Sequence, residues 1–257
     1  MTGVSEGVAM AEVARADAAS RLEMARGLLR RVERPARLDP ARVAPTPGAD
    51  GQVLPVVPAL ARVLPAGGLR RGSTVAVAAT PGATSLLFAL LAEASAAGAW
   101  AGVVGRPDLG ALAAAEAGIR LDRLALVPEP GRDLVAVVAA LVDGLDLVAV
   151  AGHERAGVRA ADRQRLAARA RQRGTVLIAL GSWAGADLEL ACTRPSWEGL
   201  VGGGAGRLRA RRAGVRVRGR GIAPGGREVP LLLPGPVGAP ETVSVDAAPV
   251  QERVAAV

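Results

Sequence analysis

The chain has 257 residues, of which half are apolar, and it carries a formal net charge of +8. It contains one cysteine and one histidine, which excludes an internal disulfide framework and the usual zinc sites built from several Cys or His ligands. All 32 basic residues are arginines, so the charge balance permits contact with nucleic acid or an acidic partner without requiring either.

The first 58 residues are predicted to lie outside the core. No secretory signal is recognised among them. Residues 1–34 contain a helical pattern over 9–34, interpreted either as a solvated surface helix or as a docking element for a partner. Residues 35–58 hold six prolines and are predicted to be a linker.

Residues 59–233 are predicted to form one α/β core with a mainly parallel sheet flanked by helices. Continuous apolar strands that alternate with helices are typical of such a sheet, covered on both faces. Strand 75–79 is expected to lie centrally. The predicted strands are 75–79, 100–104, 124–127, 147–150 and 175–180, and the predicted helices are 86–97, 109–117, 133–142 and 160–173. The longest apolar stretches, 86–104 and 134–150, contain acidic residues, so they are predicted to be core segments rather than membrane spans.

Beyond residue 186 the pattern changes. Residues 188–192 are predicted to be a short strand, and 229–233 a last apolar strand in the core. From 207 to 220 arginines alternate with Leu, Ala, Val or Gly, which is the period-two signal of a strand or hairpin. Residues 234–257 are predicted to be a flexible C-terminal tail, with a brief extended stretch near 241–245.

The alternating segment is the candidate nucleic-acid site. An extended strand would place its arginines in two groups, each on one face. Two interpretations stay open: sequence-independent contact with DNA phosphates, or a charged strand edge that opposes aggregation. The segment itself offers no aromatic side chain to stack on bases. The site residues are Arg207, Arg209, Arg211, Arg216, Arg218 and Arg220.

Four other side chains are expected to be structural. Trp183 and Trp197 are interpreted as core residues, with a partner contact as the alternative. His153 and Cys192 have no catalytic companion in the sequence. We therefore expect no metal site and no bound cofactor.

The stretch from Leu64 to Leu87 has the layout of a phosphate-binding loop: glycines, an apolar strand, a turn and an apolar helix. In a working loop, G-x-x-x-x-G-K-[ST], backbone N–H groups and a Lys hold phosphates while Ser or Thr holds Mg²⁺. This chain has no lysine, so the loop is interpreted as degenerate. Its residues are Thr80, Pro81, Gly82, Ala83, Thr84 and Ser85.

The order of these elements resembles the RecA core. The carrying stretches are LPAGGLRRGSTVAVAAT at 64–80, GIRLDRLALVPEP at 118–130 and GLDLVAVAGH at 144–153. TSLLFALLAEASAAGAWAGVVG at 84–105 and SWEGLVGGGAGRLRARRAGVRVRGRG at 196–221 are similar to the family of RecA-like mutagenesis accessory proteins of the actinobacterial ImuA-prime type. That resemblance implies a role in the DNA-damage (SOS) response and mutagenic translesion synthesis, together with an ImuB-like Y-family polymerase homologue and a DnaE-type error-prone polymerase.

Departures from the RecA pattern argue against catalysis. Where an active loop ends in Gly-Lys-Thr, this chain is matched at Thr84, Ser85 and Leu86. After the second strand stands Asp108 in place of a catalytic Glu, and the strand that would carry a catalytic Asp ends in Ala151. Arg70, Arg71 or Arg106 are candidates for weak nucleotide contact in place of the lysine.

The sequence therefore predicts a non-catalytic adaptor, with DNA as a further candidate partner and no membrane contact, in the cytoplasm. Two alternatives stay open. One is a RecA-type DNA-dependent ATPase, and the other is a cell-division inhibitor of the SulA type.

Overall fold

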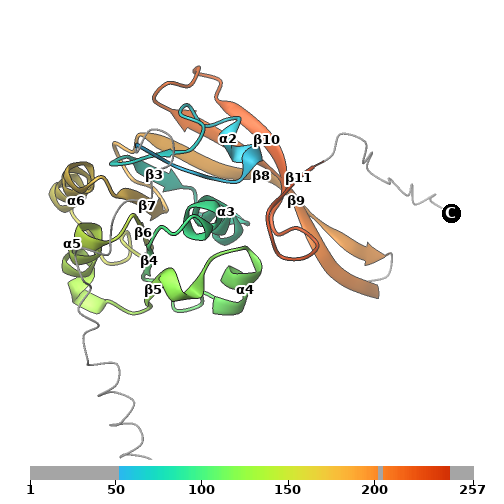
Figure 1. The fold of residues 1–257 in the computed structure, drawn as a ribbon, viewed down its shortest axis with the longest axis horizontal. Helices are drawn as coiled ribbons and strands as arrows, with labels where there is room; N and C mark the ends of the chain where they lie inside the picture. The colour runs from blue at the N-terminus through green and yellow to red at the C-terminus, as the bar shows by residue number, and fades with distance from the viewer. Residues whose placement is uncertain (1–51, 202–204, 244–257) are drawn as a thin grey trace, which may run out of the picture. The chain divides into compact units, whose positions relative to one another are not determined.

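The computed structural model of the protein describes residues 52–201 and 205–243 (Figure 1). The predicted helix at 9–34 and most of the predicted linker lie outside this range. The strands are β1 (Val53–Leu54), β2 (Leu69–Arg70), β3 (Thr74–Val77), β4 (Ala101–Val104), β5 (Leu124–Val127), β6 (Leu147–Val150), β7 (Val176–Leu180), β8 (Leu188–Val201), β9 (Ala205–Gly219), β10 (Arg227–Leu232) and β11 (Glu241–Thr242). The helices are α2 (Pro58–Ala61), α3 (Ala83–Ala96), α4 (Ala111–Glu116), α5 (Leu134–Gly144) and α6 (Ala160–Arg173), with 3-10 turns at Leu121–Arg123 and Gly131–Asp133.

Nine strands form one mixed sheet in the order β11-β10-β9-β8-β3-β7-β6-β4-β5. The strands from β8 to β5 in this order run parallel, whereas β9, β10 and β11 are added antiparallel. The predicted mainly parallel sheet is confirmed, and β3 lies centrally as expected. All four residues of β3 are buried, because both faces of a central parallel strand are covered.

Helices cover the parallel part of the sheet on both faces. α2, α3 and α4 contribute to one hydrophobic cluster, and α5 and α6 contribute to the other. α3 is apolar around most of its circumference and is accordingly almost wholly buried. α6 buries only Leu166 and Ala170 and turns its arginines outward. In the part of the chain that the structure describes, no helix covers the second face of β8, β9 and β10, where Glu189, Arg218 and Glu228 are exposed.

The most visible departure from the predicted elements is the length of β8. It was expected to end at 192 but continues to Val201 and pairs with β9 along most of its length. The pair Arg194–Pro195 suggests a strand end, yet the ladder only shifts its register there, with Arg194 at a φ of 46°. Such a bulge bends a strand without terminating it.

The core also extends past both predicted boundaries. Leu54, Val56 and Val57 are buried, and β1 pairs with β2, although these residues were assigned to the linker. The first part of the predicted tail also packs: β11 pairs with β10, and the carbonyl of Pro234 accepts a hydrogen bond from the Arg211 amide.

None of the helices within the described residues has the length and apolar character needed to cross a membrane.

Candidate functional site

The candidate site lies at the carboxyl ends of the parallel strands, where open α/β sheets bind their ligands. The loop after β3 ends at Gly82, which has a φ of 109°, and α3 starts at the next residue. The Ala83 amide donates to the Thr80 carbonyl, and the Leu86 amide donates to the Gly82 carbonyl. The loop therefore leads directly into the amino end of a long helix.

The helix starts earlier than predicted. α3 begins at Ala83, directly after Gly82, rather than at Leu86. Thr84 and Ser85 therefore lie in its first turn, and the match of Thr84, Ser85 and Leu86 to Gly-Lys-Thr stays a prediction. Leu86 is fully buried and faces the core.

Two guanidinium groups occupy the space in front of this helix end. Arg106, just after β4, donates to the hydroxyl of Thr84 at 3.0 Å and forms a bidentate pair with Asp108. Arg211, on β9, donates to the hydroxyl of Ser85 at 2.9 Å and to the carbonyl of Leu233 at 2.7 Å. Both hydroxyls in the first turn of α3 are therefore engaged by side chains of the same chain.

The acidic positions of the RecA pattern supply no carboxylate to this loop. Ala151 is buried at the end of β6. Asp108 is largely exposed, and its hydrogen bonds from Arg106 hold the pKa of its carboxyl below the usual range. Of the other arginines named for nucleotide contact, Arg71 pairs with Asp146 at 2.8 Å. Arg70 lines a separate hollow, whose other lining residues include Pro65 and Asp187. Arg106 is thus the member of that set that reaches the loop.

His153, Trp183 and Cys192 are buried, and the expected core position of Trp183 is confirmed. The Nε2 atom of His153 lies 3.0 Å from the Ser182 carbonyl, and its ring meets Trp183 edge to face. Burial raises the pKa of the Cys192 thiol, so the sulfur stays protonated at neutral pH. No group of three Cys, His, Asp or Glu side chains in the described ranges is arranged to hold a metal ion.

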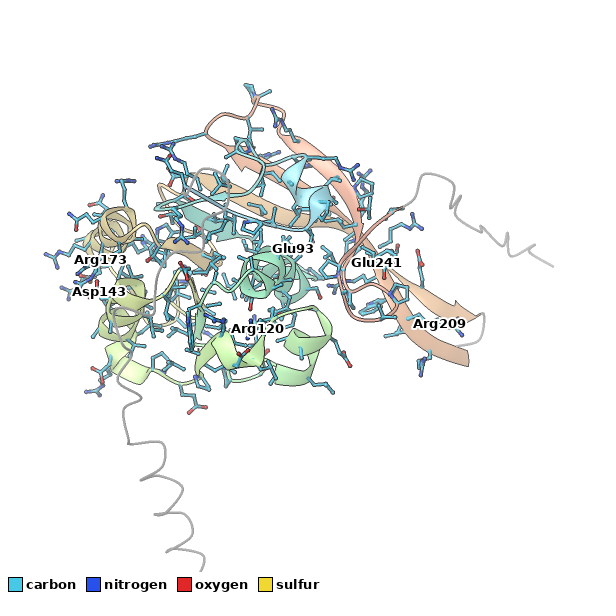
Figure 2. All side chains as sticks on the ribbon, in the orientation of Figure 1. Glu93, Arg120, Asp143, Arg173, Arg209 and Glu241 are labelled. Atoms are coloured by element: carbon cyan, nitrogen blue, oxygen red, sulfur yellow. The ribbon has the colours of Figure 1, made fainter. Side chains whose placement is uncertain are left out.

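The six arginines of the nucleic-acid candidate do not form one surface. Alternation along β9 places Arg211 on the face that also carries Val215 and Val217, which belong to the core cluster with α3. The ladder shifts its register between Ala210 and Gly206, so this alternation does not extend to Arg207 and Arg209. Arg207 and Arg209 are exposed, and Figure 2 shows Arg209 near the end of the long hairpin. Arg211 instead points inward to Ser85.

The remaining arginines are on the other face or beyond the strand. Arg216 and Arg218 lie on the opposite face of β9, where Arg216 pairs with Glu228 at 3.0 Å. Arg220 follows the strand and lies 3.5 Å from Asp187. The hydrogen bond from Arg194, with those from Thr193 and Arg216, lowers the pKa of Glu228. This second group is therefore partly neutralised by carboxylates.

Trp197 lies beside the arginines of β9, a position that its sequence context did not indicate. Trp197 on β8 is the cross-strand partner of Arg211, and the Arg211 guanidinium lies 5.2 Å from the centre of its ring. Its side chain is 46% exposed, so the expectation of a core tryptophan is wrong here. The alternation of residues over 188–198 indicates a longer strand than the predicted 188–192. The predicted strand ended too early because Arg194 and Pro195 interrupt this alternation.

Comparison with known proteins gives two matches. The family model of the MT3502 N-terminal domain matches residues 62–185, a range that includes the Thr80–Ser85 loop and ends before β8. The uncharacterized protein Rv3395c of Mycobacterium tuberculosis is 39% identical over 207 residues, which cover 78% of this chain and 96% of that protein.

Proposed function

This chain belongs to the family of the MT3502 N-terminal domain and Rv3395c, and we propose that it is a non-catalytic, RecA-like accessory protein of damage-induced translesion DNA synthesis. In this role it acts as an adaptor between an ImuB-like Y-family polymerase homologue and a DnaE-type error-prone polymerase in the cytoplasm. The resemblance of its sequence to ImuA-prime proteins motivates the choice of process and partners.

One observation carries the proposal of a binding role. The first turn of α3 follows a central parallel strand, as in a phosphate-binding loop, but its hydroxyls accept hydrogen bonds from Arg106 and Arg211. Phosphoryl transfer needs a metal ion and a positioned water, and Ala83 and Ala151 offer no ligand for either. A protein that keeps the sheet but lacks the groups for phosphoryl transfer can still bind partners through its surface. This supports the role of an adaptor.

The layout of the sheet supports the RecA-like part of the proposal. The loop follows the central strand β3, helices lie on both faces, and antiparallel strands extend one edge. The degenerate loop then replaces a bound nucleotide by internal hydrogen bonds. The competing ATPase function requires steady phosphate release from ATP by the pure protein, and we expect none above the level of a buffer control.

The adaptor function is tested by a pull-down with a purified ImuB-like protein. The chain is used in full length and without residues 1–51 or 244–257, so that the described core stays complete. We expect the full-length chain to retain the partner and one truncation to weaken retention, because segments outside a core are common docking elements. Retention by both truncated forms would place the contact on the core. Failure of every form, including the full-length chain, would contradict the adaptor function.

A further inference from the structure

The hairpin formed by β8 and β9 extends beyond the rest of the sheet (Figure 1). β8 pairs with β3 only through Leu188–Leu190, and β9 pairs with β10 only from Arg212 to Val217. Residues 194–201 and 205–211, called the arm below, therefore pair mainly with each other. The outer part of this ribbon is exposed at Trp197, Arg207 and Arg209, whereas Ala210 is buried and Arg211 is hydrogen-bonded to Leu233 and Pro234.

The arm has a strongly basic outer part. Residues 199–211 contain no Asp or Glu. The nearest acid in the sequence, Glu198, pairs with Arg212 at 3.0 Å. Arg207 and Arg209 are exposed and form no ion pair with any described residue. The ladder shifts its register here, so that Arg207, Leu208 and Arg209 bulge opposite Gly199. Both arginines line the same hollow, with Gly199 and Pro236, which suits a polyanion that contacts the two guanidinium groups together.

Trp197 lies directly opposite Arg211 in the ladder. Arg209 lines the hollow that also contains Ser85, to which Arg211 donates a hydrogen bond, so the indole lies near these arginines. Arg211 holds one side of the Trp197 ring in place. Its guanidinium donates hydrogen bonds to Ser85 and to the Leu233 carbonyl and packs against the indole. The ring is nevertheless 46% exposed. An exposed indole that is held in place is a stacking platform for a base, which loses little side-chain entropy when a ligand binds.

We propose that this part of the arm binds single-stranded nucleic acid, with one base stacked on Trp197 and the backbone phosphates held by Arg207 and Arg209. A single strand is favoured over a duplex because stacking on a side chain requires an unpaired, accessible base. Nucleic acid is favoured over a protein because one exposed aromatic ring lies near two guanidinium groups that form no ion pair with a described residue. Glu198 lines the hollow of Arg207 and Arg209 but is already paired with Arg212, and Glu116 lines an adjoining hollow with Arg209. This inference goes beyond the adaptor function and does not depend on it.

The test uses the tryptophan emission of the full-length chain, titrated with a 20-residue oligodeoxythymidylate and with a 20-base-pair duplex. Trp183 is buried and Trp100 lies against Arg123, so quenching by the oligonucleotide reports mainly on Trp197. We expect quenching by the single strand and weaker binding of the duplex. Trp197→Ala removes the fluorescent reporter, so its affinity and that of the unchanged protein are compared by the fluorescence anisotropy of a dye-labelled oligodeoxythymidylate. The variant should bind the single strand on the order of 5- to 150-fold more weakly, the value of one stacked base.

The arginines are tested through salt dependence. Because each phosphate contact on a single strand contributes a log–log slope of roughly −0.7, Arg207→Gln/Arg209→Gln should flatten the slope by about 1.4. Arg132→Gln/Arg159→Gln removes the same charge from exposed positions on other elements and should leave the slope unchanged. Circular dichroism of each variant checks that the fold is retained.

Several outcomes would overturn the proposal. They are unchanged binding by Trp197→Ala, tighter binding of the duplex than of the single strand, and an equal loss of slope in the control variant. If the arm variants lose a protein partner in the pull-down but bind the oligonucleotide normally, the arm is a protein contact instead. If the protein binds the oligonucleotide as expected but retains no partner in the pull-down, nucleic-acid binding by the arm is supported and the adaptor function is contradicted.

Discussion

At the scale of single residues, Gly82 determines how the loop closes. Its φ of 109° belongs to a region that only glycine adopts readily. A Cβ at this position would lie 2.9 Å from the sulfur of Cys192 and 3.1 Å from the Nη2 atom of Arg211. The absence of a side chain is therefore what lets Arg211 approach the start of α3 and engage Ser85.

We predict that Gly82→Ala destabilises the protein by about 1–3 kcal/mol, since it combines backbone strain with crowding at Cys192 and Arg211. Urea unfolding measures the change. Gly144→Ala is the matched control, because a Cβ there meets nothing within 4 Å and Gly144 ends a helix without a positive φ. Equal stabilities of the two variants would show that the loop accepts a side chain at position 82 and that Cys192 and Arg211 do not crowd it.

The residue scale also shows what the sequence could reveal of the site. The lack of any lysine predicts a degenerate phosphate-binding loop, and this stays a prediction. The predicted helix start at Leu86 was too late, since α3 begins at Ala83, although the Pro81–Gly82 turn marks this start. Arg211 could not be recognised as a partner of Ser85, since the two residues are 126 positions apart and only the strand order brings them together.

At the scale of elements, local patterns predicted the parallel part of the sheet well. Strands 124–127 and 147–150 and helix 160–173 have the predicted bounds, because continuous apolar runs and a glycine after α6 mark them. The long strands β8 and β9 were less visible. Their pairing is antiparallel and interrupted by a bulge, so its register depends on tertiary contacts rather than on local sequence.

Asp143 links two of these elements. It lies in the last turn of α5 and accepts hydrogen bonds from Arg169 and Arg173 of α6, the latter at 3.0 Å (Figure 2). The hydrogen bond from Arg169, with that from Arg173, lowers the pKa of Asp143 to about 2. An aspartate in an unfolded chain has a pKa of about 3.9. Its carboxylate thus stabilises the fold above about pH 4, and that contribution disappears as the pH falls toward about 2.

Asp143→Asn should therefore lower the melting temperature at pH 7 by a small amount, on the order of 1–3 °C, because exposed ion pairs contribute little. The difference from the unchanged protein should vanish near pH 2. Thermal unfolding followed by circular dichroism from pH 2 to pH 7 measures both values. Asp122→Asn, which breaks a pair with the nearby Arg120 and links no second helix, should cause a smaller change. A difference that persists at pH 2 would mean that Asp143 acts through packing rather than charge.

At the scale of the whole molecule, the core is longer than predicted. It includes residues that were assigned to a Pro-rich linker on one side and to a flexible tail on the other. Composition assigns both segments to flexible chain because prolines and glycines interrupt any periodic pattern. Their apolar residues nevertheless find partners: Leu54, Val56 and Val57 are buried with α2 and the sheet in one cluster. On the C-terminal side, Gly235 donates to the Ala239 carbonyl, in a turn that brings β11 back to β10.

We predict that a chain of residues 52–243 unfolds at the same urea concentration as the full-length protein, whereas 59–233 is several kcal/mol less stable. Each of the three buried apolar side chains removed at the N-terminal side contributes about 1.5–3 kcal/mol. Their loss alone approaches the total stability of about 5–15 kcal/mol expected of a folded domain. The forms 52–233 and 59–243 separate the contributions of the two ends. If 59–233 unfolds with the same midpoint as 52–243, then β1 and β11 lie on the core without stabilising it, and the boundaries expected from composition describe the folding unit better than the packing does.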